Sequence, residues 1–569
     1  MVDVVACAEP PEWDHCGHKA DTTDPAACRG ICVSDYTACL RHLPDADRAT
    51  YLSNLSAGDR IDHRGTTFST PLLSALLQAL RAGDGRPTFG EVDFSYATFS
   101  ESAIFDRANF TDAALFNCSI FSDEATFEHA TFDTAWFEGA IFTSWTSFSG
   151  ATFEGDVTFE GATFTHAWFP YVTFNWDADF AGSKITEELV LEGATFGNNS
   201  MHFGPLICVK SAVLRDAKFR APMTMEIAAS NVDLQRTRWD ASATIHLRYA
   251  SVELSNAVLS APVALAAHPN RFSIPTYPHG TREINESDLT GDGRSVSVTS
   301  LRGVDATHLV FTDVDLSNCE FAGVFHLDQL RIEGNCSFAN PPDGWTRRRV
   351  IIEEHYWRAL NRWNTAPPWG WAPGPHHPDP HLTPGADDLA VTYRSLRKAL
   401  EDVKNEPDAA DFYYGEMEMR RNDPKRPWGE RTLLALYWAT SGYGLRVTRA
   451  LAALGAAITA TVVALMIWGI PAGDPPPVQS IRGPLPSGHQ IDVSTYARRP
   501  GGRAPGPWQE KFSRQRAERA ARTALNSVLF HSAGQGLTRP GTYIEMASRL
   551  VEPVLLVLAA FALRGRVKR

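Results

Sequence analysis

The sequence predicts a mainly β protein: a solenoid of stacked square coils, with a small cysteine-rich cap before it and an α-helical membrane module after it. Three observations predict this organisation. A large apolar residue, nearly always Phe, returns about every five residues between Phe94 and Phe196. Five of the nine cysteines fall within the first 39 residues, and two long apolar segments lie near the C-terminus. At 569 residues the chain is long enough for several domains.

The five-residue period defines the middle of the chain. An α-helix repeats every 3.6 residues and a strand every two, so a period of five indicates a repeat array. If each unit points one large and one small residue inward, four units close a coil of about twenty residues, and coils stack about 4.8 Å apart. We expect the inward large residues to be Phe94, Phe99, Phe105, Phe110, Leu115, Phe121, Phe127, Phe132, Phe137, Phe142, Phe148, Phe153, Phe159, Phe164, Phe169, Phe174 and Phe180, most of them two positions after a small residue such as Ala97 or Ala113.

The units, which read A-x-F-x-x in this chain, resemble the pentapeptide-repeat family. The resemblance implies a right-handed quadrilateral β-helix, and we place it at residues 89–340. The pattern is clear up to residue 200 and degenerate beyond it. Residues 269–295 break the phase with Pro, Gly and Asn and are expected to form an insertion that bulges from the coil.

The predicted coil surface is acidic. Residues 91–200 hold eighteen Asp and Glu but only Arg107 and Lys184 as basic residues. Some pentapeptide-repeat proteins use such a surface to mimic duplex DNA and bind a topoisomerase. A solvated face that keeps the solenoid soluble is the simpler interpretation, and we favour it. A docking site for a protein partner remains open. The C-terminal end is basic and flanks apolar segments, which indicates a membrane surface rather than a nucleic acid as partner.

The N-terminal segment, residues 1–88, is predicted to be a small cap that binds a structural zinc ion. It has no apolar secretory signal, so we expect it to stay in the cytoplasm, where crowded cysteines favour metal binding over disulfides. Zinc takes four tetrahedral nitrogen or sulfur ligands. Free thiols and a disulfide are the alternatives. The expected ligands are Cys7, Cys16, Cys28 and Cys39, with Cys32, His18 and His42 as alternates, while Cys118, Cys208, Cys319 and Cys336 are expected to be core residues.

Two connecting segments follow the coil. Residues 341–388 combine an amphipathic helix with a proline-rich linker. Residues 389–448 are predicted to form cytoplasmic and interfacial helices, the first with Tyr393, Leu396, Leu400 and Val403 on one face.

Residues 449–569 are predicted to be a two-span membrane module. Residues 450–470 carry no charge and are long enough to cross a hydrocarbon layer of about 30 Å. The second span is predicted at residues 546–563, where Arg549 and Glu552 are costly in lipid and are expected to pair. Basic residues flank both spans, so both termini are predicted to be cytoplasmic.

The segment between the spans contains a candidate pore loop at residues 523–541. A short apolar helix is followed by Ser532, Ala533, Gly534, Gln535 and Gly536. This order resembles that of two-span pore-loop channels, in which glycines let backbone carbonyls face the ion. The loop resembles a degenerate potassium-channel filter. Gln535 and Leu537 stand where Tyr and Asp are usual, so potassium selectivity is not implied.

The whole chain resembles bacterial membrane proteins that join a cytoplasmic pentapeptide-repeat coil to a two-span, channel-like module. In these proteins the phrases Y-R-x-L and E-M-E-x-R-R precede the membrane, and here they begin at Tyr393 and Glu416. No phosphate-binding loop, H-E-x-x-H motif or nucleophile elbow is present, so we expect no enzyme and no cofactor beyond the zinc.

Three functions are compatible with the sequence. The first is a channel-like membrane protein, a homo-oligomer that would be a tetramer around any pore, with the coil as a docking or sensing domain. The second is a non-conducting scaffold tethered to the lipid membrane. The third is a DNA-mimicking protein that binds a topoisomerase.

Overall fold

The structure is a computed structural model that describes residues 7, 13–18, 28–197, 199–276, 280–341, 348–361, 376–471, 480–484, 490–494, 511–529 and 537–567. The chain divides into two compact units, Met1–Tyr413 and Tyr414–Arg569, and the boundary falls within helix α5 (Glu406–Asn422).

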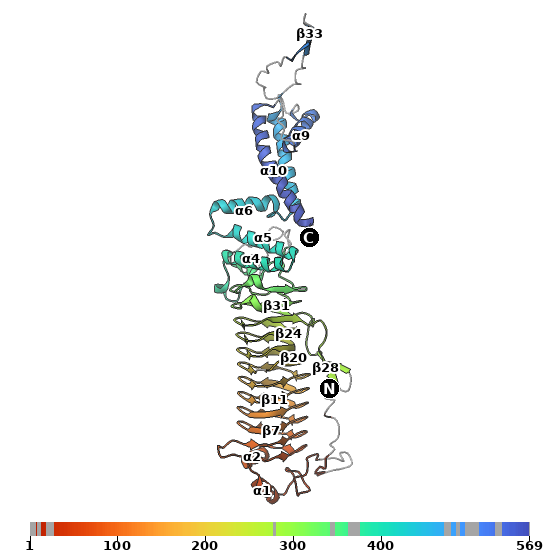
Figure 1. Ribbon diagram of the computed structural model, residues 1–569, viewed down its shortest axis with the longest axis vertical. Helices are drawn as coiled ribbons and strands as arrows, with labels where there is room; N and C mark the ends of the chain where they lie inside the picture. Colours follow the sequence, from red (N-terminus) through yellow and green to blue (C-terminus); the bar gives the residue numbers. More distant parts are fainter. Residues whose placement is uncertain are drawn as a thin grey trace. The chain divides into compact units, whose positions relative to one another are not determined.

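The first unit is a parallel β-solenoid, as the five-residue period predicts (Figure 1). Its strands form two parallel ladders, in which each strand pairs with the strand about one coil further along the chain. Phe89 pairs with Phe110, Phe110 with Phe132, and Phe132 with Phe153, so one coil takes 21 or 22 residues. The repeats therefore return to the same face after four units.

The longest strands, β20 (Met201–Val213) and β22 (Met223–Asp233), belong to the second ladder and lie after residue 200. The first ladder contains β1 (Ile61–Asp62), β3 (Thr88–Phe89), β4 (Val92–Asp93), β7 (Asn109–Leu115), β10 (Thr131–Trp136), β12 (Thr152–Phe153), β13 (Val157–Thr158), β15 (Thr173–Phe174), β16 (Ala178–Asp179), β19 (Thr195–Phe196), β21 (Lys218–Phe219), β23 (Arg238–Trp239) and β26 (Val258–Leu259). The second contains β2 (Thr67–Phe68), β5 (Thr98–Phe99), β6 (Ala103–Ile104), β8 (Ile120–Phe121), β9 (Ala125–Thr126), β11 (Ile141–Ser147), β14 (Thr163–Trp168), β17 (Lys184–Ile185), β18 (Glu188–Val190), β20 (Met201–Val213), β22 (Met223–Asp233), β24 (Ala243–Arg248), β25 (Ser251–Glu253), β27 (Val263–Ala267), β30 (Ser297–Ser300), β31 (Leu309–Thr312) and β32 (Arg331–Glu333).

Four columns of stacked aromatic rings fill the coil. Along one column the ring centroids of Phe99 and Phe121 lie 4.6 Å apart, and those of Phe121 and Phe142 also 4.6 Å. Neighbouring columns meet edge to face, the other arrangement that the ring quadrupole favours. The column that begins at Phe89 continues through Phe219 to Trp239, where the phenylalanine repeat ends.

One inward position differs from the sequence prediction. Phe116, not Leu115, points into the core, with Ala114 rather than Ala113 as its small partner. Leu115 and Phe116 are both apolar, so the five-residue period alone does not determine which of them points inward. The strand pairing determines it, because Val92 pairs with Ala114. This pairing places Phe116 over Phe94, with ring centroids 5.3 Å apart. As a consequence Cys118 lies at a corner of the coil and outside its core.

The coil starts earlier than the predicted boundary at residue 89. Ile61 pairs with Val92 and Phe68 pairs with Phe99, so the first coil includes residues of the predicted cap. Helix α1 (Asp45–Asn54) precedes this coil, and helix α2 (Thr70–Ala79) is inserted into it with buried leucines facing inward.

The expected insertion contains an antiparallel hairpin, β28 (Ser273–Thr276) and β29 (Gly280–Glu283), which packs on the side of the coil. Phe272, Ile274 and Ile284 are buried against Ile207 of β20. A buried ion pair between Arg248 of β24 and Glu286, at 2.9 Å, joins the insertion to the coil.

The C-terminal end of the first unit contains the 3₁₀ turns η1 (Ala306–His308), η2 (Leu327–Gln329) and η3 (Pro380–Leu382) and the helices α3 (Ile352–Leu360) and α4 (Ala386–Asp402). Glu354 of α3 is fully buried between Arg348 and Arg358 and accepts a hydrogen bond from the Tyr393 hydroxyl. Burial opposes ionisation of Glu354, but the two guanidinium groups outweigh it and hold its pKa at about 2. Tyr393, the first residue of the Y-R-x-L phrase, thus fixes α4 to α3.

The first helix predicted after residue 389 is α4, which ends at Asp402 before α5 begins at Glu406. Tyr393, Leu396 and Leu400 are buried as expected, but Val403 is 39% exposed because it ends α4. The next residue, Lys404, has a φ of 62°, which is incompatible with a continuous helix.

The second unit contains α6 (Trp428–Ser441), α7 (Val447–Ala464) with a π-helical turn η4 (Leu465–Gly469), the hairpin β33 (Ser480–Pro484) and β34 (Gln490–Ser494), α9 (Arg514–Leu529) and α10 (Arg539–Val567). The E-M-E-x-R-R phrase stabilises this unit. Glu418 accepts a hydrogen bond from the Tyr443 hydroxyl at 3.1 Å, and the Arg421 guanidinium lies 4.4 Å from the ring centroid of Trp438.

Candidate functional site

A group of four metal-ligand side chains lies in the N-terminal segment: Cys16, Cys28, Cys39 and His42. Two short antiparallel stretches bring Cys16 and Cys28 together, with the Cys16 N–H donating to the Gly30 carbonyl at 2.8 Å. Gly30 must be glycine here, since a Cβ on it would lie 2.8 Å from the Cys39 Cβ. The tight turn from Cys39 to His42 places the last two ligands on the same side.

The spacing of these ligand atoms fits zinc. Zn–S bonds of about 2.3 Å and Zn–N bonds of about 2.0 Å in a tetrahedron require S···S separations of about 3.8 Å and S···N separations of about 3.5 Å. The structure has 3.6 Å between the Cys28 and Cys39 sulfurs, 3.6 Å from Cys16 Sγ to His42 Nδ1, and 3.4 Å from Cys39 Sγ to His42 Nδ1. A hydrogen bond from Cys39 lowers the pKa of the Cys28 thiol to about 5.

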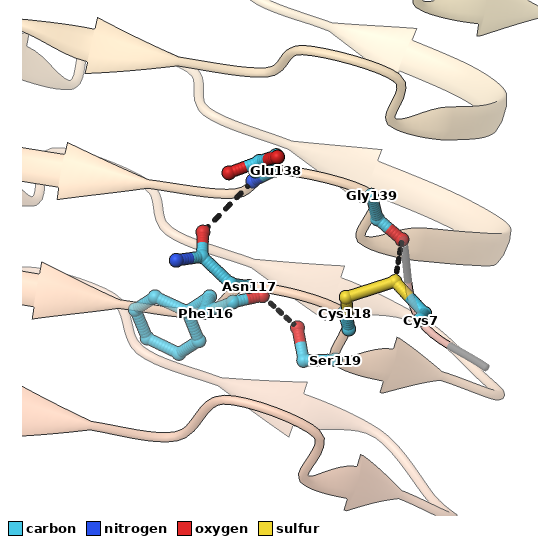
Figure 2. Close-up of a disulfide and its surroundings, with 7 residues drawn as sticks. All are labelled: Cys7, Phe116, Asn117, Cys118, Ser119, Glu138 and Gly139. Atoms are coloured by element: carbon cyan, nitrogen blue, oxygen red, sulfur yellow. Dashed lines mark hydrogen bonds between the residues drawn. A yellow bond between two sulfur atoms is a disulfide. The ribbon is translucent and has the colours of Figure 1, made fainter. Parts of the chain in front are cut away.

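Cys7 does not belong to this group, which corrects the expected ligand set. It forms a disulfide with Cys118, and its Sγ lies 3.9 Å from the Gly139 carbonyl (Figure 2). His42, an alternate in the sequence prediction, takes the fourth position. Cys32 and His18 remain outside the group, although the His18 ring stacks on His42 at 4.2 Å.

Cys118 is therefore a bonded corner residue, whereas Cys208, Cys319 and Cys336 are buried as expected. Two features of the sequence point to these contacts: the Cys39-x-x-His42 spacing and the position of Cys118 at a corner of the coil. The corner position of Cys118 can be recognised only once Phe116 is taken as the inward residue.

The coil surface carries exposed aromatic rings among its acidic residues. Trp136, Trp145 and Trp176 are 42%, 38% and 54% exposed. The rings of Trp145 and Trp168, on neighbouring strands β11 and β14, lie 4.9 Å apart. Aromatic residues are enriched in protein interfaces.

Two helices of the second unit are long and apolar enough to cross a membrane. They span Val447–Gly469 and Arg539–Leu563, with mean hydropathies of 2.3 and 1.8 over an 18-residue stretch of each. Small residues bring them together: Ala450 packs against Ala559 and Ala562, and Gly469 approaches Gly541 so closely that a Cβ on Gly541 would lie 2.6 Å from the Gly469 carbonyl oxygen. Close contact through small residues is typical of membrane helices.

The polarity of this helix pair is inverted relative to a soluble protein. Its outer face is apolar, with Leu550 74% and Phe561 60% exposed. Polar groups lie inside: Ser548 and Glu552 are buried, and Thr461 Oγ1 donates to Glu552 Oε1 at 2.7 Å.

The predicted ion pair between Arg549 and Glu552 is replaced by two other contacts. Arg549 pairs with Glu545, four residues earlier on the same helix, at 3.0 Å. Glu552 faces α7 instead. Residues three positions apart on a helix do not point in quite the same direction. Glu552 points toward α7 and therefore away from Arg549.

The candidate pore-loop residues Ser532, Ala533, Gly534, Gln535 and Gly536 lie outside the described residues. The helix expected before them is α9, which begins earlier than predicted, at Arg514. Arg516 of α9 donates to the carbonyls of Met466 and Ile470, at 2.9 and 2.6 Å, and so caps the C-terminal end of the first apolar helix.

Comparison with known proteins identifies the repeat. A family model of pentapeptide repeats matches residues 105–152 and 144–184. No curated protein and no solved structure matches the chain. The matched residues coincide with the coils whose four aromatic columns are most regular. The coil of this chain is a pentapeptide-repeat β-solenoid.

Proposed function

We propose that this chain is a membrane-anchored pentapeptide-repeat protein whose coil is a cytoplasmic docking domain. The observation that carries the proposal is the inverted polarity of the α7–α10 pair. Leu550 and Phe561 face outward, while Glu552 and Thr461 face each other inside. In water this arrangement would expose apolar area and bury a carboxylate, whereas a hydrocarbon solvent favours it.

The docking role is supported by the coil surface. Trp136, Trp145 and Trp176 stand exposed on a rigid solenoid whose surface is rich in carboxylates. We propose a protein partner with a basic surface.

We also propose that the membrane module assembles as a homo-oligomer, which would be a tetramer if it encloses a pore. Conduction through residues 532–536 is the channel form of this proposal, and a non-conducting scaffold is its alternative.

Alkaline carbonate extraction of membranes tests the anchoring. We expect the full-length chain to stay in the pellet and to require detergent for release. A chain that is soluble after membranes are pelleted would contradict the proposal. Bilayer recordings of wild type and Gly534→Val then separate channel from scaffold, because equal currents, or none from either, remove the channel.

We also propose that Cys16, Cys28, Cys39 and His42 bind one structural zinc ion that holds the N-terminal segment together. The support is the agreement of the S···S and S···N separations with a zinc tetrahedron. Elemental analysis of the full chain should find one zinc per chain in the wild type and in Cys32→Ser, a matched cysteine outside the group. Loss of zinc is expected in Cys39→Ser. A wild type without stoichiometric metal would contradict the zinc site.

A further inference from the structure

Glu552 is the most isolated carboxylate within the helix pair. It lies near the middle of the apolar segment Arg539–Leu563 and is completely buried. Its Oε1 accepts the hydrogen bond from Thr461, but among the described residues its Oε2 has no hydrogen-bond partner. A buried oxygen without a donor is rare and requires an explanation.

Among the described residues, the charged groups around this position do not neutralise Glu552. On its own helix, Arg549 is paired with Glu545. On α7 the facing group is the neutral Thr461, and Arg449 near the start of α7 lies over the Trp438 ring at 4.9 Å.

Helix α9 does not supply a counter-charge either. Its Arg516 donates to the carbonyls at the end of the first apolar helix, next to Ile544 of α10 and two turns away from Glu552. Its Glu518 and Arg522 pair with each other on the surface.

We propose that Glu552 is a proton-binding site inside the membrane, in which the uncharged carboxyl group accepts from Thr461 with one oxygen and carries its proton on the other. The inference rests on the proposed membrane anchoring, because a lipid surrounding makes an unpaired carboxylate at this depth costly. The protonated form turns the partnerless Oε2 into a hydroxyl and removes the charge. A carboxyl group that takes up and releases a proton here gives the helix pair two charge states.

Dicyclohexylcarbodiimide tests the proposal, because this apolar reagent enters membranes and modifies protonated carboxyl groups. The full-length protein is treated in membranes that have passed the carbonate test, and peptides are mapped by mass spectrometry. We expect labelling at Glu552 to exceed that at the paired Glu545 by tenfold or more and to fall as the pH is raised. Glu552→Gln, which keeps the shape and the acceptor for Thr461, should remove the label.

A second measurement does not depend on access of the reagent. The infrared difference spectrum of wild type minus Glu552→Gln should contain a band from an unionised carboxyl group. The contribution of the buried Glu353 cancels in this difference, because both proteins retain Glu353. The same band should be absent from the difference of wild type minus Glu545→Gln. Membrane-embedded protein without this band, or with equal labelling of Glu545 and Glu552, would overturn the proton site while leaving the anchoring intact. Protein that fails carbonate extraction would instead overturn the anchoring.

Discussion

The hydroxyl of Thr461 donates a 2.7 Å hydrogen bond to the buried carboxyl group of Glu552 and so joins the last turn of α7 to the middle of α10. Around this contact the helices meet through alanine and glycine, while large apolar side chains such as Leu550 and Phe561 point outward. The second unit is thus arranged around a polar seam, whereas the first is arranged around stacked phenylalanine rings.

Replacing Thr461 with Val should weaken the helix pair. The change keeps the shape but removes the donor to Glu552, and hydrogen bonds between membrane helices contribute about 0.6 kcal/mol on average and up to about 1.7 kcal/mol. The measurement is resistance of the purified protein to unfolding by increasing sodium dodecyl sulfate. Thr459→Val is the matched control, since the Thr459 hydroxyl bonds to the Gly455 carbonyl of its own helix. Equal losses in both variants would contradict an interhelical role.

Truncating one ring of an aromatic column should destabilise the coil strongly. The Phe127 ring lies between Phe105 and Phe148, with centroids 5.0 and 4.7 Å away, and its side chain is fully buried. Phe127→Ala should therefore cost about 3–5 kcal/mol, measured as a lower urea midpoint. The exposed Trp176→Ala should change it by less than about 0.5 kcal/mol. Similar midpoints for the two variants would contradict the stacked core.

The stability of the coil end should depend on pH through Glu353. Burial raises the pKa of this carboxyl from 4.5 to about 7, although the backbone N–H groups of Phe321 and Ala322 donate to it. Between these values the folded state binds more protons than the unfolded state, so stability falls as pH rises from 4.5 to about 7 and is level above that. The loss should not exceed about 3 kcal/mol.

Unfolding by urea at a series of pH values measures this effect. Glu353→Gln should flatten the profile between pH 4.5 and about 7, and the exposed Glu333→Gln should leave it as in the wild type. A wild-type profile that rises over this interval would show that Glu353 is ionised in the folded protein.

The Cys7–Cys118 disulfide tests the orientation of the coil. Disulfides persist in oxidising compartments and are reduced in the cytosol. With a cytoplasmic coil, alkylation of acid-quenched cells should find both thiols reduced, and the bond should form after purification in air. Recovery of the cross-linked peptide from quenched cells would place the coil on the other side of the membrane.

The sequence predicted the coil well because each unit repeats the same inward residue types, so errors in single units leave the architecture unchanged. It could not choose between Leu115 and Phe116, since both are apolar and only alignment with Phe94, one coil away, distinguishes them. That ambiguity hid the corner position of Cys118 and with it the partner of Cys7. Predicting that His42 rather than Cys7 is the fourth member of the metal group therefore requires knowledge of contacts between residues that are far apart in the sequence.

The C-terminal helix pair shows the same limit. Length and apolar composition predicted both apolar helices, but not which face of each helix turns inward. The three-residue spacing predicted an ion pair between Arg549 and Glu552. In the structure Glu552 instead accepts a hydrogen bond from Thr461 of α7, and Arg549 pairs with Glu545. Contacts between two helices depend on the sequences of both helices, so the residue spacing within one helix does not determine them.

Two glycines of the helix pair should respond to alanine in opposite directions. A Cβ on Gly541 would lie 2.6 Å from the carbonyl oxygen and 2.7 Å from the Cα of Gly469, and neither backbone atom can move without separating the helices. Gly541→Ala should therefore cost about 1–3 kcal/mol of helix-pair stability. Gly455 on α7 has no atom within 4 Å of such a Cβ, so Gly455→Ala should be neutral or stabilise by up to about 1 kcal/mol through helix propensity. Unfolding in sodium dodecyl sulfate gives both values, and a shift of the same sign and size in the two variants would contradict the close approach of α7 and α10 at Gly469 and Gly541.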